Sequence, residues 1–419
     1  MAEIKYWEGF EKKPTNWIVY VQRGKGELTS LSIRGVMLMV ITLGLYRFWF
    51  VSDLRRFFWS RTLVDDSPLE YTGRGLELFV GFLIAVAILL PLGLGLFGLS
   101  LVSPEIAIFG NIVYFVLLTF LGQYALFRAR RYRLNRTVWR GLRLNLTGSA
   151  WKYAFKAAGW FILSIVTLGL AWPWASASLE RFRVNHTWYG NLQFHSTAKW
   201  SDIIKPFLVI WVVLVMPVGV LALTSFATWA IFSHNVFTEL GSWVMSGLSM
   251  FGGLALYATI APIFGFLVYP WYKAVIMRTY FSHINAGSAS LSADFSTGLI
   301  YRIWFKAVLM TIAVSIVLGI LGTIVYTILS TILPANIVID PTYNALLGGI
   351  AYILWIAANY VITITIYDFG IWSNVGGSMV ISNAGCIEEV QAGSKDSVGG
   401  INEGFADALD VGGGFEIGL

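Results

Sequence analysis

The residues best suited to chemistry lie in a repeated pattern, which we call the boundary frame. It consists of an aromatic residue, an arginine seven positions later, and an Asn or Ser four positions after that, followed by Arg or His. Its fullest copy is WPWASASLERFRVNHT, in which Trp174, Arg181, Asn185 and His186 occupy these positions. Arginine binds phosphate and carboxylate groups through paired hydrogen bonds, so a repeated arginine points to an anion site. The arginines of the four copies are Arg56, Arg131, Arg181 and Arg278.

Two interpretations of the boundary frame are open. In the first, each copy is an amphipathic segment at the membrane surface, with its tryptophan at headgroup depth and its arginine near lipid phosphates. In the second, the repeats converge on a central axis and their arginines form a gate or an anionic-ligand site. The ligand- or lipid-binding candidates are Arg56, Arg131, Arg181, Arg278, Trp49, Trp174 and Trp271.

Proline and glycine interrupt corresponding apolar runs in the two halves of the chain. Pro91 and Gly93 break one run, and Pro217 and Gly219 break the other. Proline removes a backbone donor and crowds the preceding helical turn, and paired breaks of this kind mark midplane sites in transporters. With Asn111, these residues are our candidates for the lining of a transport path. The alternative is a set of packing kinks, which are common in membrane helices.

The other reactive residue types do not form a catalytic or metal-binding set. His186 and His283 stand where two other frames have arginine. We find no phosphate-binding glycine loop, nucleophile motif or paired catalytic carboxylate with a histidine. We therefore expect no catalytic residue, no metal site, no cofactor and no enzymatic activity. Acidic residues are almost absent from the long apolar blocks, which argues against coupling to protons or sodium ions.

Composition places these motifs in a membrane protein. Hydrophobic residues make up 57% of the chain and charged residues 12%, with a mean hydropathy of +0.70, whereas a soluble domain carries about 25% charged residues. The net charge of +6 is concentrated beside apolar runs, so it does not indicate nucleic-acid binding. The single cysteine, Cys386, excludes an intramolecular disulfide. The polar N-terminus has no cleaved-signal layout, so we expect the first membrane segment to direct insertion.

The distribution of positive charge predicts the topology. If all eight apolar runs cross the membrane, either the basic cluster 128–143 or the frame at Arg181 lies outside, against the positive-inside rule. If runs 35–50 and 157–179 enter without crossing, the outer loops fall near 103–105, 233–239 and 334–341, which contain no Lys or Arg. We favour this six-crossing topology, although run 157–179 is long enough to span a bilayer.

The chain also contains internal repeats and short strands. Thr42–Trp49 (TLGLYRFW) matches Thr167–Trp174 (TLGLAWPW), which indicates duplication. The predicted fold is all-α and polytopic, with three transmembrane hairpins, two re-entrant or interfacial helices and short cytoplasmic strands at 17–21, 69–72, 142–147, 192–195 and 289–295. The predicted divisions are a polar N-terminal segment (1–33), two membrane repeats (34–150 and 151–293), a third, eroded repeat (294–375) and a flexible acidic, glycine-rich tail (376–419).

The segments TLGLYRFWFVSDLRRFFWSRT and TLGLAWPWASASLERFRVNHT, with the closing NEGFADALD, resemble the YjgN-like family of bacterial inner-membrane proteins. The resemblance covers most of the chain. It implies a multi-pass protein of the bacterial inner membrane and supplies no established activity or catalytic residue. The last copy departs from the family pattern, because Phe369 stands where an arginine is expected.

These observations predict a transporter or channel-like protein for a neutral or anionic small solute or lipid. The alternative is a non-transporting scaffold that binds anionic lipids through its boundary frames, and a lipid-modifying membrane enzyme is a less favoured third possibility. The expected partners are membrane lipids with anionic headgroups and, for a homo-oligomer, further copies of the chain; nucleic acid is not expected. The basic loops and the C-terminal tail are expected in the cytoplasm.

Overall fold

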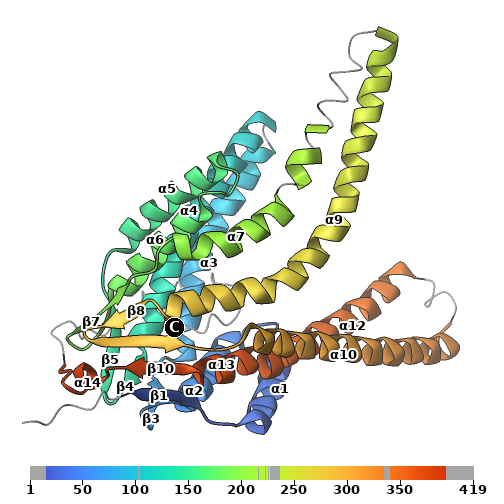
Figure 1. Ribbon diagram of the computed structural model, residues 1–419. Helices are drawn as coiled ribbons and strands as arrows, with labels where there is room; N and C mark the ends of the chain where they lie inside the picture. The colour runs from blue at the N-terminus through green and yellow to red at the C-terminus, as the bar shows by residue number, and fades with distance from the viewer. Residues whose placement is uncertain are drawn as a thin grey trace, which may run out of the picture.

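The computed structural model describes residues 16–101, 104–215, 217–221, 223–224, 226, 236–334 and 340–392. Within this part of the chain one order of elements occurs five times: a strand, a pair of helices and a second strand. We number these repeats as units 1 to 5 in chain order. Figure 1 shows the strands together at one end of the molecule, with the helical pairs extending away from them.

The strands of the described residues are three to five residues long. They are β1 (Trp17–Val21), β2 (Thr62–Val64), β3 (Ser67–Tyr71), β4 (Thr137–Trp139), β5 (Leu142–Leu146), β6 (Thr187–Tyr189), β7 (Leu192–Ser196), β8 (Ile284–Ala286), β9 (Ala289–Ala293) and β10 (Met379–Ser382).

These strands pair in an antiparallel order that closes on itself. Each strand pairs with its neighbours in the chain, and β1 pairs with both β2 and β10, so the ten strands form a closed barrel. Closure leaves none of these ten strands with an open edge for pairing with another chain. Tight turns join the units: Asp65 and Asp66 between β2 and β3 have φ of 48° and 58°, the left-handed conformation that two-residue hairpin turns need.

One backbone hydrogen bond is repeated in every unit at the point where the helices leave the barrel. The amide that follows the first strand donates to the carbonyl of the residue that precedes the second strand. The N···O pairs are Gln22–Arg61 (2.8 Å), Thr72–Arg136 (2.8 Å), Thr147–His186 (2.8 Å), Thr197–His283 (3.0 Å) and Asp294–Ser378 (3.4 Å). The five units therefore share one construction, although their helices differ in length.

Aromatic side chains fill the barrel. Trp139 contacts Trp17 and Tyr189, with ring centroids 5.7 and 5.3 Å apart, and the Tyr189 hydroxyl donates to the Trp139 carbonyl at 3.1 Å. The short helix α14 (Gly385–Glu388) follows β10, and Ala384 and Ile387 pack against this cluster. The barrel is therefore a packed core.

Units 1 and 3 carry short helical pairs. These are α1 (Lys25–Ile41) with α2 (Arg47–Ser60), and α5 (Ala150–Val166) with α6 (Trp172–Asn185). The repeated TLGL sequence forms the turn within each pair: Leu43 and Leu168 have φ of 50° and 51°, and the following glycines have 90° and 88°. The preceding threonine caps the next helix, because the Thr42 and Thr167 hydroxyls accept from backbone amides four residues on. The chain turns back at both sites, and the turn leucines are exposed.

Units 2, 4 and 5 carry long apolar pairs. These are α3 (Gly75–Ser100) with α4 (Pro104–Asn135), α7 (Ser201–Leu214) with α9 (Val236–Phe281), and α10 (Thr297–Ile332) with α12 (Pro341–Ile362). In unit 5 the π-helix η1 (Thr363–Asp368) and α13 (Phe369–Gly376) continue α12 to the barrel.

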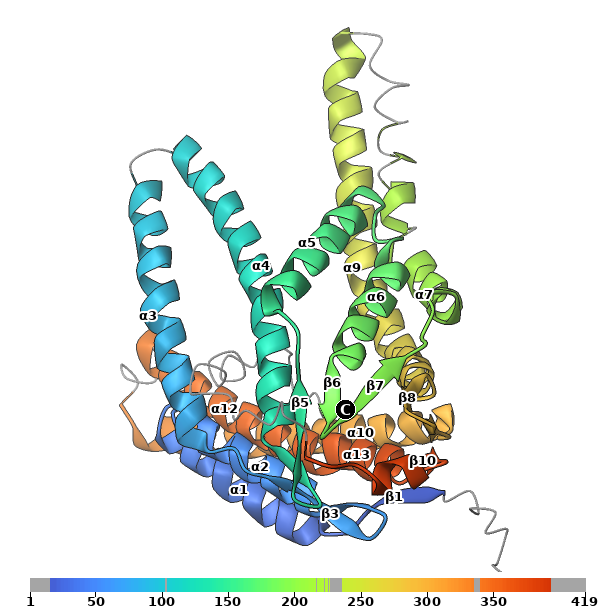
Figure 2. The ribbon, with the colours of Figure 1, turned by 90° about the vertical axis from the view of Figure 1, so that its left-hand side faces the viewer.

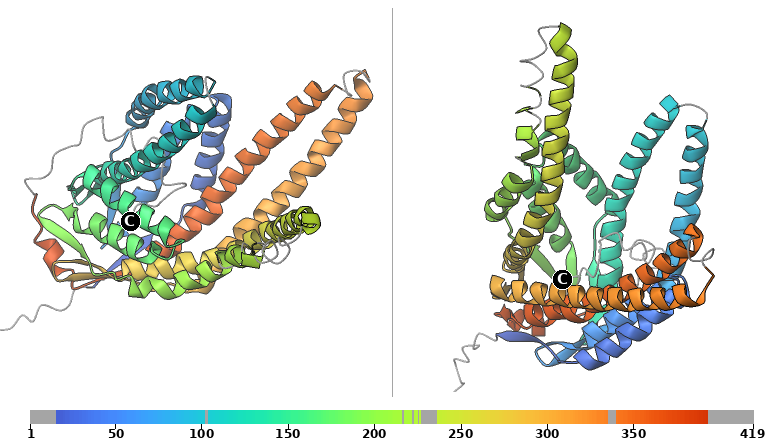
Figure 3. Two further views of the ribbon diagram at one scale, coloured as in Figure 1. Left: turned by 90° about the horizontal axis from the view of Figure 1, so that it is seen from above. Right: turned by 90° about the vertical axis from the view of Figure 1, so that its right-hand side faces the viewer.

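Six helices in the described residues are long and apolar enough to cross a membrane. They are Gly75–Leu99, Ala107–Asn135, Ser201–Leu221, Tyr257–Phe281, Thr297–Ile332 and Pro341–Gly376. Neither short pair is among them. Figure 2 shows the short pair α5 and α6 on the α4 side of the pair α3 and α4. Figure 3 shows that the long pairs leave the strands in different directions, with α10 and α12 turned away from α3, α4 and α9.

The prediction of an all-α fold is wrong, because the barrel is a central part of the architecture. The five predicted short strands are confirmed as β1, β3, β5, β7 and β9, and the sequence analysis missed the other five. Those are three or four residues long, which is too short for an alternating pattern to develop, and four of them (β2, β4, β6 and β8) follow helix ends rich in charge. The described part of the predicted tail contains β10 and α14. Residues 393–419, and residues 103, 233–235 and 335–339 of the predicted outer loops, lie outside the described residues.

Candidate functional site

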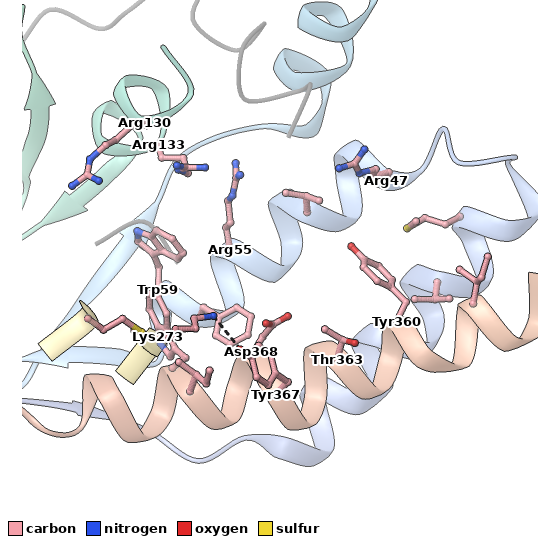
Figure 4. A pocket seen from close by; sticks show the side chains of 18 of the residues that line it. Arg47, Arg55, Trp59, Arg130, Arg133, Lys273, Tyr360, Thr363, Tyr367 and Asp368 are labelled. Atoms are coloured by element: carbon pink, nitrogen blue, oxygen red, sulfur yellow. Dashed lines mark hydrogen bonds between the residues drawn. The ribbon is translucent and has the colours of Figure 1, made fainter. Parts of the chain in front are cut away.

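A cavity of about 1040 Å³ lies between the helical pairs, next to the barrel. All five units line it, mainly through the helix that returns to the barrel: α2, α4, α6, α9 and the α12–η1–α13 segment. Figure 4 shows part of the lining, with side chains from different units directed toward a common space. Sites between helices of a bundle are common places for ligands.

The lining residues occupy one face of each returning helix, fixed relative to the frame arginine. The residue before that arginine lines the cavity in units 1 to 4, as Arg55, Arg130, Glu180 and Met277. The residue two positions after it also lines the cavity, as Phe58, Arg133, Arg183 and Tyr280. Residues three apart share a helix face. The frame arginine itself is absent from the lining in each of these units.

The cavity is strongly basic. Among the described residues, six cationic and two acidic side chains line it, so the cations exceed the acids by four. The acids are Glu180 and Asp368, and the cations are Arg47, Arg55, Arg130, Arg133, Arg183 and Lys273. A recess lined by charges of one sign concentrates its electric field and raises the local concentration of counter-ions. The arrangement is suited to holding an anion.

The charged side chains gather at the barrel end of the cavity. Glu180 is buried, forms an ion pair with Arg183 and lies 3.8 Å from the Arg130 guanidinium. Burial alone would raise the pKa of Glu180, but the charges of Arg183 and Arg130 and the hydrogen bond from Arg183 outweigh it, so the pKa is lowered. Glu180 is therefore a carboxylate at neutral pH and positions two of the arginines.

A second group of polar side chains comes from units 4 and 5. The Lys273 ammonium donates to the Tyr367 hydroxyl at 3.1 Å and lies over the Tyr367 ring. Asp368 is next to Tyr367 and 8% exposed, and Figure 4 shows it directed toward the same space as Lys273. The Arg55 guanidinium, from unit 1, is also buried and donates to the Tyr71 hydroxyl at 3.1 Å.

The opposite end of the cavity is apolar. Its walls come from α1 and α12, two helices that pack against each other. The apolar lining residues there are Val36, Met39, Val40, Leu43, Ile353, Ile356 and Ala357. Arg47 lies apart from the other cations, at the start of α2, as Figure 4 shows. The cavity thus has a basic end at the barrel and, between α1 and α12, a mainly apolar end near Arg47.

The predicted frame arginines lie outside this cavity. Arg56 donates to the Gly73 carbonyl at 2.8 Å, Arg131 to the Leu146 carbonyl at 2.9 Å, and Arg278 to the Phe295 carbonyl. Each acceptor belongs to the next unit, so these three arginines join neighbouring units. Arg181 is exposed on α6. The structure thus gives three of the frame arginines a role in joining units, and the predicted role of all four in ligand binding remains a prediction.

The predicted frame tryptophans lie at helix contacts. Trp49 packs against Phe79 with ring centroids 5.5 Å apart, and Trp174 stacks on Trp200 at 4.7 Å. Trp271 is partly buried in α9. None of the three lines the cavity.

The predicted path residues are also absent from the cavity lining. Pro91 lies inside α3 and Asn111 in α4, both exposed, and Gly93 is close to the Tyr114 hydroxyl. Pro217 and Gly219 lie in the described helical residues after α7. The path itself remains a prediction. The described residues contain no group of three His, Cys, Asp or Glu side chains placed to hold a metal ion.

The fifth frame is displaced from its predicted position. The repeated backbone hydrogen bond places Ser378 in unit 5 where unit 1 has Arg61. The residue equivalent to Arg56 is therefore Ser373, four positions after Phe369. Placing Phe369 at the arginine position therefore misaligned the unit by four residues. In the structure Trp372 corresponds to Arg55 and lines the cavity as Arg55 does.

Sequence reasoning missed the cationic lining residues, although a signal was present. Each lies one position before or two positions after a frame arginine, or on the same helix face one turn earlier (Lys273) or two turns earlier (Arg47). The helical period, applied to the four aligned frames, would have separated the residues that face the centre from those that face the neighbouring unit.

The six apolar helices, together with the five units joined by the closed barrel, define a multi-pass membrane protein with a basic cavity between its units. A family model described as a bacterial protein of unknown function matches residues 23–331. The chain therefore belongs to this DUF898 family, and the resemblance to the YjgN-like proteins, which are the same family, is confirmed. Searches of the curated proteins and of the solved structures found no match.

Proposed function

We propose that the protein is a transporter of the bacterial inner membrane that takes an anionic solute or lipid into its central cavity. The observation that carries this proposal is the excess of four cationic over acidic side chains in a cavity lined by all five units. A neutral substrate, the other possibility from the sequence, has no need of this charge. The scaffold alternative relies on the frame arginines, three of which donate to backbone carbonyls of neighbouring units.

The same proposal places the barrel in the cytoplasm. Lys and Arg are absent from 75–127, 206–272 and 307–394, which hold most of the long apolar helices. The described basic residues lie in the barrel, in the short pairs or at the barrel ends of the long helices. Positive charge is retained on the cytoplasmic side of membranes, so this distribution supports a cytoplasmic barrel and outward-directed hairpin tips.

Charge-selective labelling tests whether the cavity is an anion site. Thr363 lines the cavity and is exposed, so a Thr363→Cys change in a Cys386→Ser background places one reactive thiol there. A sulfonate-bearing methanethiosulfonate reagent should react faster than a trimethylammonium-bearing one, by at least about tenfold relative to the exposed control Ser288→Cys. Tenfold corresponds to about 1.4 kcal/mol of favourable potential. If the ratio of sulfonate to trimethylammonium labelling rates is the same at Thr363→Cys and Ser288→Cys, the proposal of an anion site is refuted.

Sidedness of the same labelling separates transport from scaffolding. A transporter exposes its cavity to each face in turn, so membrane-impermeant reagent should reach Thr363→Cys in both right-side-out and inside-out vesicles. Ser288→Cys, in the turn between β8 and β9, should react only in inside-out vesicles. Access to Thr363→Cys from the cytoplasmic face alone, under every condition, would refute transport and favour the scaffold.

A further inference from the structure

We infer that the ligand of the central cavity is an amphiphile, with an anionic, phosphate-type headgroup at the basic end and an apolar chain between α1 and α12. This inference rests on the proposed function, because it names the ligand class of the same cavity. It adds that charge alone is insufficient for binding and that the ligand enters from the bilayer.

The basic end is built for an anion with several oxygen atoms. Arg55, Arg130, Arg133, Arg183 and Lys273 approach it from four units, and Glu180 positions two of these arginines. Arginine presents a planar set of donors that matches phosphate geometry, which a single lysine does not. A cluster of mostly arginine therefore favours a phosphate or phosphodiester over a simple inorganic ion.

The cavity is longer than a small anion. Along unit 5 its lining extends from Ile353 to Trp372, through α12, η1 and α13. Ile353 and Asp368 are 15 helical steps apart, which corresponds to about 22 Å at 1.5 Å per step of an α-helix. An inorganic anion at the basic end would leave the apolar portion without a ligand group, whereas a chain attached to the headgroup would occupy it.

The apolar end is accessible from outside the protein. Val40 is 38% exposed, Leu43 94%, Ile353 48% and Ile356 45%, although all four line the cavity. The short pair α1–α2 turns back at Leu43 and is not among the helices that cross. The wall formed by α1 therefore ends part of the way along α12. Beyond this point the exposed apolar side chains of α12 face lipid. A lipid-like chain can enter here without passing through water.

The test compares three probes that separate the two parts of the ligand. Full-length protein with Thr363→Cys and Cys386→Ser is placed in phosphatidylcholine nanodiscs, and the rate of maleimide labelling is measured. The probes are palmitoyl-lysophosphatidylglycerol, palmitoyl-lysophosphatidylcholine and glycerol 3-phosphate, which supply the anionic amphiphile, the same chain with a zwitterionic head, and the anionic head alone. We expect about tenfold slower labelling with the first probe and less than twofold change with the other two. Labelling of Ser288→Cys corrects for any change in surface charge.

Variants identify the two ends separately. Arg133→Gln should reduce protection by lysophosphatidylglycerol about tenfold, and Lys273→Gln supplies a second test if that variant does not fold. Val40→Trp, which narrows the apolar end, should reduce the same protection while the preference for the sulfonate reagent remains. Ile316→Trp, on an exposed face of α10 outside the cavity lining, is the matched control and should change neither.

Each other outcome contradicts a specific part of the inference. Equal protection by glycerol 3-phosphate would show that the chain is unnecessary and would overturn the amphiphile, while the anion-transport proposal would stand. Equal protection by lysophosphatidylcholine would overturn the requirement for an anionic headgroup. Loss of the sulfonate preference in the unmodified cavity would instead refute the proposed function itself.

Discussion

Replacing Glu180 by glutamine removes the buried carboxylate that neutralises part of the partly buried arginine cluster. The side chain is 9% exposed, is ion-paired with Arg183 and lies 3.8 Å from Arg130. Removal of one partner from a buried ion pair costs about 3–5 kcal/mol, because the remaining charge stays buried without its counter-charge. Glu180→Gln should therefore lower the free energy of unfolding by about that amount. The same change raises the excess positive charge of the cavity, so labelling of Thr363→Cys by the sulfonate reagent should accelerate.

The assay is reversible unfolding in mixed detergent micelles, followed by tryptophan fluorescence. The matched control is Asp53→Asn, which removes an acid from an exposed pair: Asp53 is 3.2 Å from Arg56, and the two side chains are 37% and 48% exposed. Such a pair contributes less than about 1 kcal/mol. A loss for Glu180→Gln no larger than that for Asp53→Asn would refute the reasoning that Glu180 stabilises the arginine cluster.

The pH dependence supplies an independent check of the same pair. The pKa of Glu180 is lowered in the folded protein from its ordinary value of 4.5. Its contribution to stability is therefore fully present well above pH 4.5 and is lost as the pH falls through the lower folded value. Glu180→Gln should lack this component of acid destabilisation. An unchanged acid transition in the variant would contradict the assignment.

Three further changes test the packing around the cavity. Gly35→Ala should cost about 1–3 kcal/mol, because the added methyl would lie 2.1 Å from the buried Phe50 ring. Trp372→Phe should cost about 1 kcal/mol, since the indole donates to a threonine hydroxyl at the start of β2 at 2.8 Å. Arg131→Gln should cost about 2 kcal/mol through its bonds to carbonyls of the next unit, while the equivalent, exposed Arg181→Gln should cost less than about 0.5 kcal/mol. Unfolding curves measure all four, and equal costs at the two arginines would contradict the inter-unit role.

The sequence predicted the repeated parts of the fold better than their assembly. The TLGL repeat located two equivalent turns. Such a turn depends only on neighbouring residues, namely a capping threonine followed by a leucine and a glycine in the left-handed conformation. The strands β1, β3, β5, β7 and β9 were visible from alternation or strand composition over five residues. The pairing of β1 with β10 was not predictable, because it joins segments at opposite ends of the chain and has no local signal.

The candidate site was misplaced for a related reason. Three of the four regularly spaced arginines, Arg56, Arg131 and Arg278, make the same kind of contact between units. The cavity residues vary from unit to unit, as Arg55, Arg130, Glu180 and Met277 show at one equivalent position. Regular spacing therefore identified residues that join the units, whereas the residue type at the cavity-facing positions differs from one unit to the next.

Closure of the barrel by β1 and β10 also sets an order for biosynthesis. β1 has two pairing edges, and the edge that pairs with Ile381 and Val380 has no partner until the end of β10 has been made. The helical pairs can enter the membrane one after another, but the ring that holds their bases together is completed last. A chain that stops before Met379 would retain exposed strand edges on β1 and β9, which favour association with other chains. The closing strand therefore distinguishes a finished protein from a truncated one.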